Sequence, residues 1–211
     1  MNWISLISLP IAYLLGSIPS AYLIARFWGK IDIRDEPDGR ISAAAVYRRV
    51  GRAAFLTVVV CDIGKAALAV WIASLLSSYL PLVLLAGIVT IAAHQWSPFV
   101  RFQGGRGATV IGGVMVVIAT VPTIVAAAIA ELAALITKSS SYGFGIGIMA
   151  LVISFVAMRY AGIAVQPFNI ISPFPFPPDW TLIVYPLIAL GMMVAKALQV
   201  KYRPGDRIIV K

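Results

Sequence analysis

The sequence predicts an all-α integral membrane protein, built as a bundle of about seven transmembrane helices. Hydrophobic residues make up 61% of the 211 residues and charged residues only 12%, a balance far from that of soluble globular domains. The hydrophobic residues occur in long runs, and most lysines and arginines fall in the short segments between those runs. This pattern favours a multi-pass membrane protein that folds as a single domain over residues 1–211.

The individual spans follow from the need for roughly 20 apolar residues to cross a hydrocarbon core of about 30 Å. The predicted helices cover residues 4–27, 53–76, 80–93, 108–120, 122–137, 142–158 and 180–198. The first two are long enough to cross alone, whereas the third, fourth and fifth are short and closely spaced. No charged segment precedes the first run and no small-residue cleavage site follows it, so we expect it to be retained as a span.

The distribution of basic residues predicts how the helices are oriented. Lysines and arginines cluster after the first span and in the carboxyl-terminal tail, two arginines follow the third span, and Lys138 follows the fifth. The loops after the second and fourth spans carry no charge, and the sixth loop holds only Arg159 and Asp179. The positive-inside rule then places the amino terminus outside and the carboxyl terminus in the cytoplasm, with the protein in the cell inner (plasma) membrane. Because the net charge of +9 lies in short loops beside apolar spans, we expect membrane lipids and no nucleic acid as partners.

A polar segment at residues 94–109, HQWSPFVRFQGGRGAT, interrupts the apolar runs and carries the most chemistry. Its glycine turn, GGRG at residues 104–107, contains three glycines that can take up positive φ and let backbone N–H groups approach a ligand. Arg106 adds a planar cation, and a helix that begins at Ala108 would direct unpaired N–H groups at the same anion. The turn predicts a phosphate site; the alternative is a tight connection between helices whose arginine is only a topology signal.

Two charged residues in the second predicted span, Asp62 and Lys65, lie three positions apart and share one helix face. An unpaired charge in mid-membrane costs at least about 2.5 kcal/mol, so we expect the two to pair. The pair either fixes helix packing or contributes Lys65 to an anion site at the cytoplasmic mouth.

His94, at the end of the third span, is either a hydrogen-bonded packing residue or a catalyst. With one histidine and one cysteine, Cys61, in the chain, no metal site is predicted.

Two proline-containing segments are predicted to shape the fold. GSIPS, at residues 16–20, breaks the first span, and we assign it to close helix packing first and to a site second. The loop at residues 159–180 contains ISPFPFPPDW, whose prolines block a helix and whose aromatic rings suit the membrane interface. We expect this loop to form an external lid on the membrane surface. Glu131, in the fifth span, is assigned no role.

In chain order, GSIPSAYLIAR, IDIR, DIGKA and AHQWSPFVRFQGGRG resemble the motifs of bacterial glycerol-3-phosphate acyltransferases that use acyl phosphate as donor. The resemblance is collinear from the first span to the glycine turn. It implies a membrane enzyme of phospholipid biosynthesis with seven helices and an active site that opens to the cytoplasm. It also implies acyl transfer from acyl phosphate to the 1-position of glycerol 3-phosphate, giving lysophosphatidic acid, without metal, coenzyme A or another cofactor.

The resemblance also implies site residues. The family's GGKG turn matches the glycine turn, with Arg106 in place of lysine, and the family's Asp, Lys and His match Asp62, Lys65 and His94. An arginine after its first motif matches Arg48, and a serine of a later loop matches Ser141. We therefore expect catalytic roles for His94, Lys65 and Arg106. The expected substrate-binding residues are Gly39, Arg40, Ser42, Arg48, Asp62, Gly104, Gly105, Gly107, Thr109 and Ser141.

Acyl transfer of this kind requires no nucleophile from the protein, because acyl phosphate is already an activated donor. The site need only position two phosphates and neutralise charge on the leaving phosphate, with an apolar groove for the acyl chain. Arg106, Lys65 and Arg48 are the predicted electrostatic clamp. Either His94 or a substrate phosphate removes the proton of the attacking hydroxyl.

The chain departs from the family's pattern in two places. PDGRISAAA, at residues 37–45, replaces a loop rich in Ser, Asn and Thr, and leaves Arg40 and Ser42 as substitute polar contacts. The tail lacks the family's His and Asn. The alternative is therefore a non-catalytic homologue that binds lipid or packs as a structural subunit with partners in a membrane complex. A transporter is the third candidate, but the sequence lacks the internal repeat that is typical of many transporters.

Overall fold

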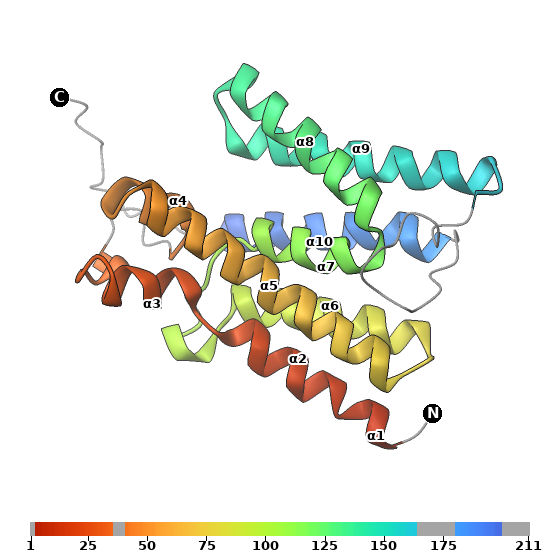
Figure 1. Ribbon diagram of the computed structural model, residues 1–211, viewed down its shortest axis with the longest axis horizontal. Coiled ribbons are helices and arrows are strands. Elements are labelled where there is room, and N and C mark those ends of the chain that lie inside the picture. Colours follow the sequence, from red (N-terminus) through yellow and green to blue (C-terminus); the bar gives the residue numbers. More distant parts are fainter. Residues whose placement is uncertain (1–2, 36–40, 164–179, 200–211) are drawn as a thin grey trace.

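The computed structural model describes residues 3–35, 41–163 and 180–199, and these ranges contain helices and no β-strand (Figure 1). The first predicted span is broken into three helices, α1 (Trp3–Leu6), α2 (Ser8–Ser17) and α3 (Ser20–Phe27). Helix α2 ends where Ile18, with ψ of 116°, and Pro19, which has no N–H, leave the helical conformation. The break leaves backbone carbonyl groups without helical partners inside a membrane span, so other parts of the protein must satisfy them.

A short polar connection follows α3 and closes one end of the bundle. It contains the 3₁₀ helix η1 (Ile33–Asp35) and helix α4 (Ala43–Arg49). Ala25, Ile33 and Val46 are buried together in a small core that these elements share. This core places the residues before α4 beside the end of α3.

The centre of the bundle is formed by α5 (Arg52–Leu76) and α6 (Leu80–Gln95), which is followed by the 3₁₀ helix η2 (Pro98–Val100). Helix α2 packs against α6 at Gly16, where an added Cβ atom would lie 2.5 Å from the carbonyl oxygen of Thr90. The absent side chain therefore allows the two backbones to approach closely, as is usual between membrane helices. The packing role predicted for GSIPS is confirmed at this glycine.

Helix α7 (Ala108–Ile118) is short and almost wholly inside the bundle. It packs on α5 through Gly113, where a Cβ atom would lie 2.5 Å from the carbonyl oxygen of Ile63. The chain then turns at Ala119 into α8 (Thr120–Thr137), which pairs with α9 (Ser140–Tyr160) along one edge of the bundle (Figure 1). Helix α10 (Trp180–Gln199) packs against α9, α6 and α7.

The predicted all-α membrane fold is confirmed. Within the described ranges, six helical segments are long and apolar enough to span a membrane, and Ala108–Ile118 is a shorter apolar helix. The predicted spans match these segments to within a few residues at their ends. The count of seven spans, the orientation of the termini and the single-domain organisation stay predictions. The proposed lid falls mostly on residues 164–179, outside the described ranges.

Candidate functional site

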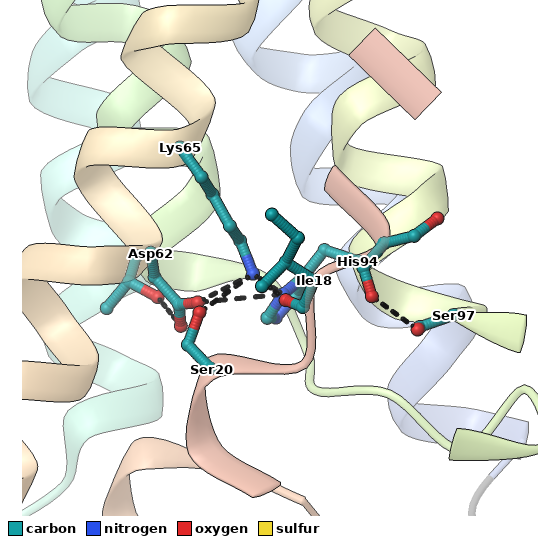
Figure 2. Close-up of polar contacts among 8 residues, drawn as sticks. Ile18, Ser20, Asp62, Lys65, His94 and Ser97 are labelled. Carbon is teal, nitrogen blue, oxygen red and sulfur yellow. Dashed lines mark hydrogen bonds and ion pairs between the residues drawn. The ribbon is translucent and has the colours of Figure 1, made fainter. Parts of the chain in front are cut away.

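Lys65 joins three parts of the chain at the proline break in the first span. Its Nζ atom lies 2.8 Å from Oδ1 of Asp62 on the same helix and donates to the carbonyl oxygen of Ile18 at 2.6 Å. The same ammonium lies 3.3 Å from Oγ of Ser20 and 3.1 Å from Nδ1 of His94 (Figure 2). One buried cation therefore ties α5 to the broken first span and to the end of α6, and the predicted pairing with Asp62 is confirmed.

The hydrogen-bonding capacity of Lys65 is used within the protein. An ammonium group has three N–H donors, and Lys65 faces four acceptor groups from its own chain. Only 8% of the residue is exposed. A substrate phosphate would have to displace one of these acceptors to reach Nζ. The geometry thus favours a positioning role for Lys65 over the direct phosphate contact that its charge alone suggests.

Asp62 connects this cluster to the start of α7. Its Oδ2 atom accepts a hydrogen bond from Oγ1 of Thr109 at 3.0 Å, and its Oδ1 atom lies 3.9 Å from Nδ1 of His94. Thr109 belongs to the first turn of α7, where the helix dipole favours a negative charge. The carboxylate therefore stabilises the helix start directly after the glycine turn. Thr109 as a substrate contact stays a prediction.

The contact with Lys65 favours one tautomer of His94. A lysine ammonium can only donate, so a hydrogen bond at this contact requires that Nδ1 of His94 accept and carry no proton. A neutral ring then carries its proton on Nε2. This second nitrogen faces the glycine turn, since a Cβ atom added to Gly105 would lie 2.8 Å from it. His94 therefore presents a hydrogen-bond donor to the turn.

The glycines of the turn are needed mainly because other backbone groups pack closely against them, and less because of unusual backbone angles. Of its three glycines only Gly107 has a positive φ, of 89°, so Gly104 and Gly105 do not use the freedom of φ that glycine offers. A Cβ atom at Gly104 would collide with the carbonyl oxygen of His94, and one at Gly105 would lie 3.1 Å from that of Ile41. The predicted helix start at Ala108 is confirmed.

Two polar residues that the sequence did not single out make further contacts, Gln95 to the glycine turn and Ser97 to the end of α2. Nε2 of Gln95 donates to the carbonyl oxygen of Arg106 at 2.8 Å, and Gln95 is fully buried. Oγ of Ser97 donates to the carbonyl oxygen of Ser17, the last residue of α2, at 2.5 Å (Figure 2). The signal was present in the sequence, because Gln95 and Ser97 alternate with apolar residues directly after His94.

The Arg106 side chain extends from the turn toward the beginning of α9. Its Nη1 atom donates to Oγ of Ser141 at 3.3 Å, which brings together two predicted site residues that are far apart in the sequence. A small pocket also borders the turn. The residues that line it are Pro19, Ser20, Ala21, Ile41, His94, Ser97, Val100, Gly104 and Gly105. The turn therefore carries a guanidinium group and borders a pocket with a histidine in its wall.

The remaining predicted site residues lie apart from this cluster or outside the described ranges. Ser42 is the N-cap of α4, where its Oγ atom accepts from the backbone N–H of Ala45 at 3.2 Å, so it has a structural role. Arg48 is exposed in the last turn of α4. Gly39 and Arg40 fall in the range 36–40, outside the description. Substrate binding by these four residues stays a prediction.

The IDIR motif forms a local ion pair after α3. The Arg34 guanidinium donates to both carboxylate oxygens of Asp32, and it also lies 5.1 Å from the ring centre of Tyr22. The hydrogen bonds from Arg34 lower the pKa of Asp32 to about 2. The motif therefore contributes to the shape of this connection.

The chain is similar to curated proteins and to a solved structure. It is 40% identical over 126 residues to Glycerol-3-phosphate acyltransferase 4 of Dehalococcoides mccartyi (strain CBDB1), covering 60% of this chain and 54% of the relative. It is 35% identical over 151 residues to Glycerol-3-phosphate acyltransferase 5 of Dehalococcoides mccartyi (strain ATCC BAA-2266 / KCTC 15142 / 195), covering 72% and 64%. In both alignments the chain thus spans less than two thirds of the relative's length.

The fold is that of a known crystal structure, PlsY (YgiH), described as an integral membrane glycerol 3-phosphate acyltransferase in its glycerol 3-phosphate form. The two structures superimpose with a TM-score of 0.74 at 19% identity, over 92% of this chain and 88% of the other. A family model described as Glycerol-3-phosphate acyltransferase matches residues 6–203. The resemblance carried by the motifs up to the glycine turn is therefore confirmed, the family model extends the match to residue 203, and the chain belongs to the glycerol-3-phosphate acyltransferase family.

Proposed function

We propose that this chain transfers an acyl group from acyl phosphate to the 1-hydroxyl of glycerol 3-phosphate at the cytoplasmic side of the inner membrane. The products are lysophosphatidic acid and inorganic phosphate. Membership of the family supports acyl transfer to glycerol 3-phosphate. The resemblance of the motifs supports acyl phosphate as donor. The observation that carries the proposal is the convergence of the proline break, α5, α6 and the start of α7 on the glycine turn.

The proposed reaction is one nucleophilic substitution at a carbonyl carbon. The hydroxyl oxygen of glycerol 3-phosphate attacks the acyl carbon, and the bond between that carbon and the phosphate oxygen breaks. The leaving phosphate takes the electron pair of this bond. The hydroxyl proton passes to a phosphate oxygen, so atoms and charge balance without a covalent intermediate on the protein. The protein then acts by placing two anions together and stabilising the leaving phosphate.

In this reaction Arg106 is the main anion ligand. Its guanidinium is a planar donor suited to two phosphate oxygens, and Ser141 orients it from the start of α9. Gly104 and Gly105 let the turn pack closely against the carbonyl oxygen and the Nε2 atom of His94, in the wall of the small pocket. The chemistry of the turn therefore fits a phosphate.

His94 acts in this proposal as a donor to a substrate oxygen through Nε2. The alternative, in which His94 removes the hydroxyl proton, requires an unprotonated Nε2. That tautomer would carry a proton on Nδ1, which would point at the Lys65 ammonium, whose Nζ atom lies 3.1 Å from Nδ1. The geometry thus favours a substrate phosphate as proton acceptor, with Lys65, Asp62 and Thr109 as positioning residues.

The test is product formation by the purified protein in phospholipid vesicles. Palmitoyl phosphate and glycerol 3-phosphate are supplied together, and lysophosphatidic acid is measured by mass spectrometry. Palmitoyl coenzyme A replaces the donor in one control, and glycerol replaces the acceptor in another. We expect product only from the pair of phosphate substrates. Product from palmitoyl coenzyme A alone would refute the donor, and a lack of product from either donor would favour the non-catalytic homologue.

A further inference from the structure

Lys196, near the end of α10, is a buried cation that the proposed reaction does not yet use. The residue is 7% exposed, although it lies in an apolar helix. Its Nζ atom donates to the carbonyl oxygen of Phe102 at 3.0 Å and lies 5.3 Å from the ring centre of Trp96. Within the described ranges no carboxylate lies at ion-pair distance from it. A buried charge with no counter-ion among the described residues of the bundle points to a specific task.

The carbonyl group that Lys196 contacts belongs to a backbone conformation that needs support. Arg101 and Phe102 have φ of 54° and 62°, and two successive non-glycine residues seldom adopt this left-handed conformation. The backbone N–H of Phe102 donates to the carbonyl oxygen of Ser97 at 2.8 Å, which closes the loop on itself. A second contact from α10 acts on the same loop, because Nε1 of Trp96 donates to Oε1 of Gln199 at 2.9 Å.

This loop leads directly into the glycine turn. Phe102 precedes Gly104 by two residues, and Gly104 fits against the carbonyl oxygen of His94 with no room for a Cβ atom. A shift of the Phe102 carbonyl group therefore moves the turn out of this contact. Since Gly105 lies against Nε2 of His94, the same shift alters the pocket between them.

We propose that Lys196 is a positioning residue for anion binding, which acts by holding the Phe102 carbonyl group and so the glycine turn in its binding conformation. Gln199 supports it through Trp96. The anion is a phosphate monoester, which rests on the proposed function. The clamp on the loop does not rest on it, so the two can be tested separately.

The test of the clamp is hydrogen–deuterium exchange over residues 97–107, measured by mass spectrometry in one detergent. Lys196→Met keeps the length of the side chain and removes the donor, whereas Lys196→Arg keeps a cationic donor. We expect exchange at the amide groups of Phe102 and Gln103 to accelerate several-fold in Lys196→Met and to return toward the parent's rate in Lys196→Arg. Lys30→Met, which removes an exposed charge, is the matched control and should leave this exchange unchanged.

The kinetic measurement on the same proteins separates positioning from general damage. Loss of a charge-assisted hydrogen bond predicts a rise of roughly tenfold in the KM for glycerol 3-phosphate in Lys196→Met, with kcat within about twofold of the parent. Equal exchange and equal KM in parent and Lys196→Met would overturn the assignment, as would a fall in kcat with KM unchanged. Should Lys196→Met not fold, Gln199→Leu at the exposed end of α10 must show the same acceleration, and its absence overturns the clamp. An inactive parent with accelerated exchange in Lys196→Met would refute the proposed function alone.

Discussion

The Lys65 ammonium lies 2.6 Å from the carbonyl oxygen of Ile18, the residue at which the first membrane span leaves the helical conformation. Each group also has a partner close to it in the sequence, because the carbonyl oxygen of Ile18 accepts from the backbone N–H of Ser20 at 3.0 Å and Lys65 pairs with Asp62. A lysine in an apolar span needs several acceptors, and a carbonyl oxygen at a helix break can take a second donor. The bond between them therefore joins α5 to the broken span. The contact also fixes the distance between α5 and the broken span, on which the position of His94 beside the glycine turn depends.

The buried ion pair of Lys65 with Asp62 predicts strong coupling between these two residues. Replacing Lys65 by Met removes one member of a buried ion pair, and we expect a loss of about 3 to 5 kcal/mol in the free energy of unfolding. Asp62→Leu should cost a similar amount, and the double variant less than the sum of both. Unfolding in mixed micelles measures the three values. Strictly additive effects would show that the two residues do not act as a pair.

The assignment of the proton on His94 is directly observable, because the chain contains one histidine. In protein labelled with ¹⁵N-histidine, NMR should show an imidazole protonated at Nε2 and not at Nδ1. In Lys65→Met the donor to Nδ1 is gone, so a mixture of the two tautomers is expected. A proton on Nδ1 in the parent would contradict the donor role of His94 and restore its role as a base.

The packing of α7 on α5 provides a matched pair of adjacent glycines. Alanine at Gly113 would place its Cβ atom 2.5 Å from the carbonyl oxygen of Ile63, whereas alanine at Gly112 would meet nothing within 4 Å. We expect Gly113→Ala to destabilise the protein by about 1 to 3 kcal/mol. Gly112→Ala should be neutral or stabilise it by up to about 1 kcal/mol. Equal thermal unfolding temperatures of the two variants would contradict this helix contact.

Much of this arrangement could be predicted from the sequence, because membrane spans and charge pairs are local signals. The spacing of Asp62 and Lys65 on one helix face was sufficient to predict their pairing. The role of Ile18 was not predictable, since its carbonyl oxygen meets a side chain 47 residues away. The contact of Lys196 was not predictable for the same reason, because it joins residues 94 positions apart, although a lysine in an apolar helix is a signal in the sequence.

The orientation of the bundle remains to be measured. Gln103, beside the glycine turn, and Ala161, just after α9, are both exposed. The alternation of basic loops predicts that they lie on opposite sides of the membrane. Single cysteines at these positions, in a background in which the exposed Cys61 is replaced by Ala, should react with an impermeant maleimide from opposite sides. Reaction of both from one side would refute the predicted topology.

The central claim, that the glycine turn with Arg106 binds the phosphates between which the acyl group moves, is tested most directly by phosphate release. Purified parent, Arg106→Lys and Arg106→Ala are given palmitoyl phosphate with and without glycerol 3-phosphate. We predict that release by the parent depends on glycerol 3-phosphate, falls modestly in Arg106→Lys, which keeps the charge, and falls roughly 10- to 100-fold in Arg106→Ala. Release that does not depend on glycerol 3-phosphate, or that is equal in the parent and Arg106→Ala, would contradict the account.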